Sequence, residues 1–275
     1  MIADLPPPVE VRRPAGRAGP FIFASPHAGT IYPEALRAVS MLDARALRGS
    51  EDALVDRLIA GMEGLGATLI LNRIARAYVD VNRGPSDLDP ALVGLPGAGS
   101  PRAEAGFGVV PRRVGEGQDI YAEPLKPAEV EARIAAVHRP YHDALTALVR
   151  EAQAEHGWAA VIDWHSMPSP GGQRAQRLIV LGDRHGASCA SALTGSAKRL
   201  FQARGYQVGL NAPYAGGWTT QAWGRPGEGV HALQIEIDRS LYLDPDTLEP
   251  NAGFERLRSD LHQVARGLLM LDLST

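Results

Sequence analysis

Short apolar runs alternate with helical patterns along the chain. The apolar runs predict buried strands at 21–24, 67–71, 78–81, 161–162, 178–181 and 233–237. Apolar residues spaced three and four apart predict helices after Ser50 and at 127–156, 187–204 and 252–272. We expect Ser50 to cap the first helix and Pro140 to kink or split the second. This alternation predicts an α/β fold with a mixed, mostly parallel central sheet flanked by helices.

Three stretches lack a clear period. Residues 1–19 are rich in Pro and Arg and are expected to form an irregular lead-in, while 82–126 and 211–229 are rich in Gly and polar residues. Loops of this length inside a compact domain usually have a function. The chain contains no internal repeat and no inner linker, so we expect a single domain over residues 1–275.

Charge and cysteine content narrow the function classes. Lys and Arg total 28 and Asp and Glu total 31, so there is no basic excess to bind nucleic acid. No run reaches the roughly 18–20 apolar residues of a membrane span. The single cysteine, Cys189, excludes an internal disulfide and a zinc site of paired cysteines, and we expect a buried, inert thiol. The first residues lack a signal-peptide pattern, which favours a cytoplasmic location, and nothing indicates the oligomeric state.

Polar residues directly follow several of the predicted strands. In open α/β sheets, ligands bind beyond the carboxyl ends of strands. A catalytic zinc ion commonly has three protein ligands chosen from His and carboxylates. His27 and His165 are therefore candidate zinc ligands, with a third, oxygen ligand from Glu51 or Asp52. Asp163 shares a strand face with His165 and could bond its other ring nitrogen.

Other candidate sites are weaker. His138 and His142 have a spacing that can bind zinc on a helix, but no Glu follows His138 and Pro140 lies between them. The turn at 182–186 could bind a small anion or be purely structural. Glu236 alternates with apolar residues, so it faces either solvent or a polar cleft. No serine lies in a nucleophile elbow.

Six motifs in order resemble those of the N-formylglutamate amidohydrolase family. They are SPHAG at 25–29, YVDVNR at 78–83, DWHSM at 163–167, GDRHG at 182–186, NAPYAGG at 211–217 and LQIEI at 233–237. The resemblance runs from Phe21 to Tyr242. The family is similar to zinc carboxypeptidases and aspartoacylases, which implies a phosphorylase/hydrolase-like, zinc carboxypeptidase-like fold.

The resemblance also implies roles for individual residues. It matches His27, Asp52 and His165 to the zinc ligands, and its pattern favours Asp52 over Glu51. One departure is Thr30, which stands where the peptidase relatives place their acidic ligand. The resemblance matches the pair Asn82 and Arg83 to the residues that grip substrate, and Glu236 to the general base.

The implied reaction is the zinc-dependent hydrolysis of an N-acyl amino acid. N-formyl-L-glutamate is the expected substrate, with formate and glutamate as products, in histidine degradation. Arg83 would stabilise the oxyanion or bind a substrate carboxylate. Because the substrate has two carboxylates, Arg184, His185 and Tyr214 are further candidates for binding it. A deacylase of another acyl amino acid or small amide, or a ligand-binding relative without catalysis, are the alternatives.

Overall fold

The chain forms two compact units, each assembled from separate segments. The computed structural model describes residues 5–94, 99–115, 117–169 and 178–274. Met1–Glu10, Pro26–Glu51 and Leu71–Leu145 form the first unit. Val11–Ser25, Asp52–Ile70 and Thr146–Thr275 form the second. The predicted extent of a single domain, residues 1–275, stays a prediction.

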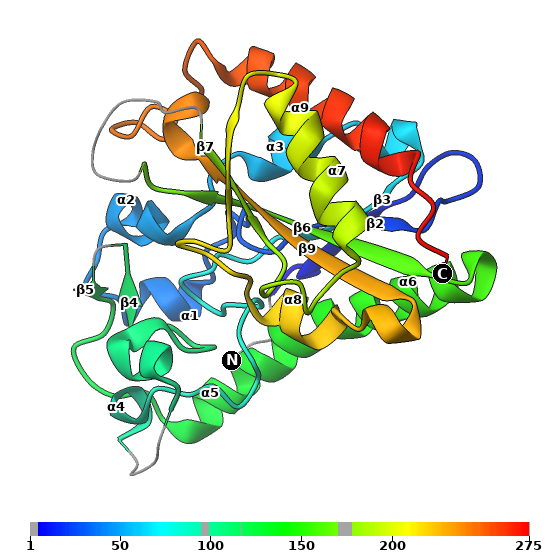
Figure 1. The fold of residues 1–275 in the computed structure, drawn as a ribbon. Helices are drawn as coiled ribbons and strands as arrows, with labels where there is room; N and C mark the ends of the chain where they lie inside the picture. The colour runs from blue at the N-terminus through cyan, green and yellow to red at the C-terminus, as the bar shows by residue number, and fades with distance from the viewer. Residues whose placement is uncertain (1–4, 95–98, 116, 170–177, 275) are drawn as a thin grey trace. The chain divides into compact units, whose positions relative to one another are not determined.

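A seven-stranded sheet provides the framework (Figure 1). Its order is β1 (Val9–Arg12), β3 (Thr68–Asn72), β2 (Phe21–Ser25), β6 (Ala159–Met167), β9 (Val230–Asp238), β7 (Leu178–Gly182) and β8 (Gln207–Leu210). β2, β6 and β9 run parallel to one another, β7 runs antiparallel to β9, and β8 is parallel to β7. The prediction of a mixed, mostly parallel sheet is therefore confirmed.

Helices of the second unit cover its strands with apolar faces. They are α3 (Val55–Ile59), α7 (Ser191–Gln202), α8 (Trp218–Trp223) and α9 (Phe254–Leu269), with 3₁₀ turns at Met62–Leu65, Pro226–Glu228 and Arg239–Leu241. α7 packs beside α9, and α8 contacts β6 and β9 (Figure 1). The predicted apolar face of α9 is buried, at Phe254, Leu257, Leu261, Val264 and Leu268.

The first unit contains shorter elements and most of a long helix. The short elements are α1 (Glu34–Arg37), α2 (Ala44–Leu47), a 3₁₀ turn at Arg48–Ser50, α4 (Pro90–Val93), a π-turn at Ala103–Phe107, and the hairpin of β4 (Arg113–Val114) and β5 (Gln118–Asp119). The long helix consists of α5 (Pro127–Arg133), a π-turn (Ile134–His138) and α6 (Arg139–His156), which continues into the second unit. The π-turn ends two residues before Pro140, which cannot donate a backbone hydrogen bond. Pro140 thus distorts the helix without ending it.

Several predicted elements were wrong. Residues 78–81 form a buried turn rather than a strand, because a short apolar run does not distinguish the two. Ser50 lies in a 3₁₀ turn and caps no helix; the predicted helix after it is divided between α3 and a 3₁₀ turn, with Leu54 (φ 64°) and Gly61 (φ 92°) in the left-handed region.

The predicted irregular stretches hold more structure than their composition indicated. The lead-in at 1–19 contains β1, although residues 1–4 lie outside the described ones. The stretch at 82–126 contains short helices and a hairpin, and 211–229 contains α8. The edge strand β8 was missed because it is short and partly exposed. Within the described ranges, no helix has the length and apolarity to cross a membrane.

Candidate metal centre and active site

His165 lies near the carboxyl end of β6, between two carboxylates of the second unit. Nε2 of His165 is 2.9 Å from Oδ2 of Asp163, two residues earlier on the same strand face. Nδ1 of His165 is 2.9 Å from Oδ2 of Asp52. All three side chains are almost completely buried. The contact with Asp163 is the one that the strand spacing predicted. Because Asp163 occupies Nε2, the other ring nitrogen, Nδ1, faces Asp52.

Asp52 is held by side chains from the ends of β6 and β9. Nη2 of Arg239 donates to Oδ1 of Asp52 at 3.0 Å, and the Ser166 hydroxyl donates to the same oxygen at 3.3 Å. Arg239 also donates from Nε to Ser166 at 3.0 Å. The backbone beside Asp52 is fixed by Tyr242, whose hydroxyl donates to the Ala53 carbonyl at 2.9 Å. One oxygen of Asp52 is thus anchored while the other faces His165.

Glu236 lies beside His165 on the neighbouring parallel strand. The register of β6 and β9 pairs Asp163 with Gln234 and His165 with Glu236. Glu236 is only 6% exposed, and Nε2 of Gln234 donates to its Oε1 at 2.8 Å. The polar face of β9 is therefore an interior face, which excludes a solvent-exposed surface carboxylate at this position.

The second unit concentrates negative charge around His165. Burial lowers the pKa of His165, but Asp163, Asp52 and Glu236 raise it and together prevail, so the pKa lies well above its ordinary value. Three carboxylates therefore converge on one imidazole, and Arg239 is the cation that pairs with Asp52. Such a cluster favours a bound cation.

His27, in the first unit, is held by the carboxylate of Asp80. Its Nε2 is 2.7 Å from Oδ1 of Asp80, and both side chains are buried. The preceding residue, Pro26, is fixed through its carbonyl, which accepts a 2.8 Å hydrogen bond from Asn72. A Cβ at Gly29 would lie 2.4 Å from the Ile74 carbonyl oxygen, so the close approach of this loop requires glycine. Because Asp80 occupies Nε2, Nδ1 of His27 is the ring nitrogen that a metal could use.

Asp80 connects His27 with the turn that carries Asn82 and Arg83. Nε of Arg76 donates to Oδ2 of Asp80 at 2.9 Å, and the Asn82 amide donates to Oδ1 at 2.8 Å. Nε of Arg83 lies 3.8 Å from Oδ2, too far for a hydrogen bond. Burial raises the pKa of Asp80, but Arg76, His27 and Arg83 lower it further, so it lies well below its ordinary range. The contact of Asp80 with His27 was missed, although Asp80 lies in the YVDVNR motif, two residues before Asn82.

Glu51, the alternative to Asp52, has different partners. Its Oε1 accepts hydrogen bonds from the Tyr32 hydroxyl at 2.5 Å and from Nε of Arg48 at 3.1 Å. These contacts, all within the first unit, explain how a carboxylate that is 2% exposed is stabilised. Of the two adjacent acids, Asp52 is the one in contact with an imidazole.

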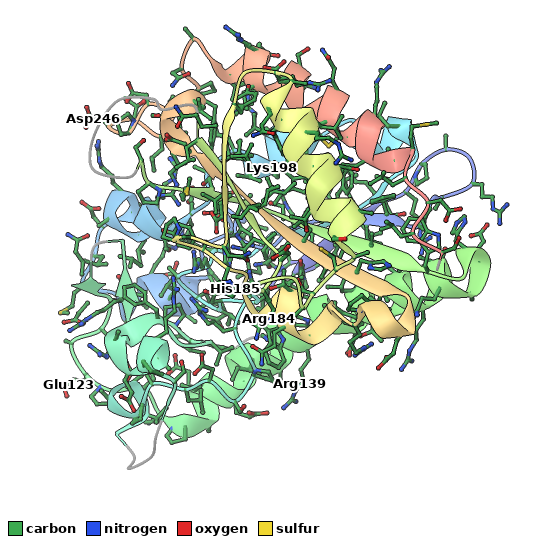
Figure 2. The ribbon with its side chains drawn as sticks, in the orientation of Figure 1. Glu123, Arg139, Arg184, His185, Lys198 and Asp246 are labelled. Atoms are coloured by element: carbon green, nitrogen blue, oxygen red, sulfur yellow. The ribbon has the colours of Figure 1, made fainter. Side chains whose placement is uncertain are left out.

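The antiparallel direction of β7 separates Arg184 and His185 from the carboxyl ends of β6 and β9. Gly182, the last residue of β7, is paired with Gln234, and the following turn runs toward the start of β9. The two residues have left-handed φ angles of 52° and 58°, with Arg184 half-buried and His185 exposed (Figure 2). The loop at 211–217, which includes Tyr214, returns toward the polar face, because the Gly217 amide donates to Gln234 at 2.8 Å.

His138 and His142, the rival metal pair, each contact a backbone carbonyl. Nε2 of His138 is 2.8 Å from the Arg83 oxygen, and Nε2 of His142 is 2.8 Å from the Val81 oxygen. Among the described residues, the group of buried side chains that could together hold a metal ion consists of His27, Asp52 and His165. Both helix histidines therefore contact backbone oxygens of the turn at 81–83.

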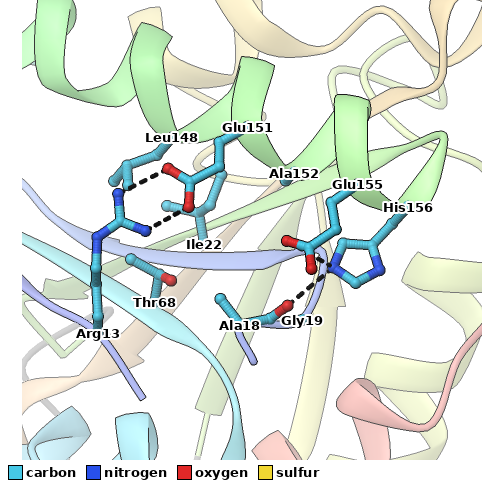
Figure 3. A pocket seen from close by; sticks show the side chains of 10 residues that line it. All are labelled: Arg13, Ala18, Gly19, Ile22, Thr68, Leu148, Glu151, Ala152, Glu155 and His156. Carbon is cyan, nitrogen blue, oxygen red and sulfur yellow. Dashed lines mark hydrogen bonds and ion pairs between the residues drawn. The ribbon is translucent and has the colours of Figure 1, made fainter. Parts of the chain in front are cut away.

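A pocket in the second unit is lined by a different set of side chains (Figure 3). Arg13 and Glu151 form a two-pronged ion pair across it at 2.5 and 2.7 Å, and His156 is 2.8 Å from the Ala18 carbonyl oxygen. The pocket includes Ile22, near the amino end of β2, and none of the predicted site residues line it. It is therefore separate from the candidate active site.

Comparisons with known proteins agree with the motifs. The family described as N-formylglutamate amidohydrolase matches residues 19–243. Two proteins named N-formylglutamate deformylase are similar: one from Pseudomonas aeruginosa is 31% identical, covering 91% of this chain and 90% of its own, and one from Pseudomonas putida is 29% identical, covering 91% of each. The crystal structure of N-formylglutamate amidohydrolase from Ralstonia eutropha JMP134 superposes with a TM-score of 0.88 and 35% identity, covering 96% of this chain and 97% of that one.

Proposed function

The chain belongs to the N-formylglutamate amidohydrolase family, and we propose that it hydrolyses N-formyl-L-glutamate to formate and L-glutamate with the help of a zinc ion. One observation carries the proposal. His165 and Glu236 lie opposite each other on the neighbouring strands β6 and β9, and Asp52 is within hydrogen-bond distance of Nδ1 of His165. A buried carboxylate beside a histidine that could bind a metal supports the proposed pairing of base and metal. A role in histidine degradation is part of the same proposal.

We assign the zinc ion to His27, Asp52 and His165. Two imidazoles and one carboxylate are a donor set found in catalytic zinc sites, which keep one position for water or substrate. Both histidines support this assignment in the same way, because a carboxylate occupies Nε2 in each and directs Nδ1 toward a metal. The carboxylates around His165 supply negative charge that a dication would offset.

Chain connectivity supports the participation of His27. β2 runs parallel to β6, and Ala24 is paired with Asp163. His27 comes two residues after Ser25, the last residue of β2, and two residues of chain reach at most about 7 Å. This short connection supports the inclusion of His27 in the proposed zinc-binding group.

A bound zinc ion would supply Lewis acidity and promote the ionisation of water at neutral pH. Glu236 takes a proton from the attacking water and later delivers it to the leaving nitrogen. The water oxygen adds to the formyl carbon, the carbon–nitrogen bond breaks, and the products are formate and the free amino group of glutamate. Gln234 orients Glu236 through its hydrogen bond to Oε1.

Arg83 is proposed to bind the negative charge of the substrate. Its Nε is buried and has no hydrogen-bond partner among the described residues, so the guanidinium retains a donor for a ligand. Burial lowers the pKa of Arg83, an effect that Asp80 partly offsets. Its acceptor is the oxyanion or a substrate carboxylate, and Asn82 would bind beside it. Arg184, His185 and Tyr214 stay candidates for the other carboxylate.

The test combines metal analysis with product analysis. Purified protein is loaded with zinc, its metal content is measured, and formate release is followed on N-formyl-L-glutamate and a panel of other N-acyl amino acids. We expect one zinc per chain, preference for the formyl substrate, and loss of activity with a chelator that zinc restores. Preference for another acyl amino acid would overturn the substrate assignment. Binding without turnover and without zinc would indicate a ligand-binding relative.

Glu236→Gln tests the proposed base. The exchange keeps the shape of the side chain and removes its ability to take a proton, so kcat should fall about 10²- to 10⁴-fold while zinc remains bound. Glu123→Gln, at an exposed position, is the matched control (Figure 2). Full turnover by a zinc-loaded Glu236→Gln enzyme would exclude this role.

A further inference from the structure

Two histidines on the long helix hold the turn that carries Asn82 and Arg83. Nε2 of His142 is 2.8 Å from the Val81 oxygen, and Nε2 of His138 is 2.8 Å from the Arg83 oxygen. A carbonyl oxygen only accepts hydrogen bonds, so each Nε2 carries the proton and donates it. The two contacts lie on either side of Asn82 along the backbone.

The helix geometry brings both rings to the same turn. The π-turn at Ile134–His138 ends just before Pro140, and the rings of His138 and His142 lie 4.4 Å apart between centroids, tilted by 35°. His138 is 3% exposed, and burial lowers its pKa, which favours the neutral ring. Because His138 and His142 are four residues apart on the helix, both donors lie on one helix face.

Asp80 holds the same turn from its other side. Its Oδ1 accepts the Asn82 amide at 2.8 Å, and its carbonyl accepts the Arg83 amide at 3.3 Å. The amides of Asn82 and Arg83 are therefore bonded to Asp80, and the carbonyls of Val81 and Arg83 to the helix histidines. With both kinds of backbone group bonded, the turn has little freedom to shift.

We propose that His138 and His142 are positioning residues that set the orientation of Asn82 and Arg83 for substrate. This inference rests on the proposed function, in which those two side chains bind substrate. Each histidine acts through the backbone and does not touch substrate or metal. A displacement of about 1 Å in a substrate-positioning group can cost 10²-fold in rate, so small changes in the turn should be measurable.

Four variants test the proposal: His138→Leu, His138→Gln, His142→Leu and His142→Gln. Leucine removes the donor and leaves a carbonyl without its partner, whereas the glutamine amide can restore a donor. His156→Leu is the matched control, because His156 lies on the same helix and contacts the Ala18 carbonyl oxygen at the same 2.8 Å, in the separate pocket of Figure 3.

Three measurements are made on every zinc-loaded variant: zinc content, the KM and kcat for N-formyl-L-glutamate, and amide hydrogen exchange of the peptide that contains Asn82 and Arg83. We expect the leucine variants to keep zinc, exchange faster in this peptide, and lose about 10- to 100-fold in kcat/KM, mainly through a higher KM. The glutamine variants should recover most of this loss. His156→Leu should match the parent in kinetics and in exchange of this peptide.

The proposal is overturned if the leucine variants keep the parental KM and exchange, if their loss follows loss of zinc, or if glutamine restores nothing. Hydrogen exchange does not depend on turnover. If the parent protein fails to hydrolyse the substrate, the proposed function fails, and the exchange data still decide whether the histidines hold the turn.

Discussion

The two compact units each present one of the proposed zinc-binding histidines, and they hold it in different ways. In the second unit, His165 is part of a strand and contacts two carboxylates, Asp163 on its own strand and Asp52 at a loop. In the first unit, His27 lies in a loop and contacts the carboxylate of Asp80, which is itself bonded to Arg76 and to a backbone amide. One histidine is placed by strand register, and the other by a charged network.

This difference has an energetic consequence. A strand residue is oriented by many backbone hydrogen bonds, so losing one neighbour should change metal affinity more than the fold. The position of a loop residue depends on its side-chain partners, so losing Asp80 should weaken both metal binding and the stability of the fold. We therefore expect a substitution beside His165 to lower zinc affinity with little change in the free energy of unfolding. A substitution beside His27 should lower both quantities.

The largest effect is expected from removing either histidine. His27→Ala and His165→Ala should each lose stoichiometric zinc, because three ligands are the minimum in this class of site. The loss of metal chemistry is expected to reduce kcat/KM by at least about a thousandfold. Metal analysis and formate release check both variants, with His156→Ala as the control. Retention of zinc and turnover by His27→Ala would remove the first unit from the metal site.

Exchanging Asp80 and Asp163 for asparagine should separate the two regions. Either variant should bind zinc about 10- to 100-fold more weakly, because its histidine loses the carboxylate on Nε2. Asp80→Asn should also lower the free energy of unfolding by about 3 kcal/mol, since Arg76 and Arg83 would lose their shared buried partner. Zinc titration and denaturant unfolding measure the two quantities. Equal losses of stability in both variants would contradict the proposed difference between strand and loop.

Arg239→Met should have a smaller effect, confined to the second unit. The variant loses the hydrogen bonds to Asp52 and Ser166 but keeps all three zinc ligands, so zinc affinity should fall by about tenfold or less. Arg225→Met, which alters an exposed ion pair, is the control. An unchanged zinc affinity would show that Asp52 is positioned by its backbone alone.

Asp183, in the turn after β7, gives the smallest predicted effect. Burial raises its pKa, but hydrogen bonds from Asn211, Gly186 and Thr194 lower it further, so the folded pKa lies below the unfolded value of about 3.9. A lowered folded pKa stabilises the fold above the unfolded pKa, and this contribution is lost as pH falls through the folded pKa.

Asp183→Asn should therefore be less stable than the parent near pH 7, and the gap should narrow below about pH 4. Thermal unfolding across this range measures the gap, with exposed Asp246→Asn as the control (Figure 2). A gap that widened in acid would reverse the sign assigned to Asp183.

Hydrophobic patterning predicted the fold class and five of the main strands, β2, β3, β6, β7 and β9, because buried strands need continuous apolar runs. It also predicted the apolar face of α9, since one helical stripe must meet the core. Patterning failed at residues 78–81, where buried turn and strand have the same composition, and at β8, where an edge strand needs few apolar residues.

The ordered motifs identified the family, and their His, Asp and Glu side chains are residue types that metal-assisted hydrolysis would use. Which atoms meet was decided by tertiary structure alone. Strand register placed Glu236 beside His165, and the antiparallel β7 directed the turn with Arg184 toward the start of β9. Asp80 contacts His27 and Arg239 contacts Asp52, and each pair is far apart in the chain. Sequence spacing alone does not give the direction of a side chain in three dimensions, so these contacts could not be predicted.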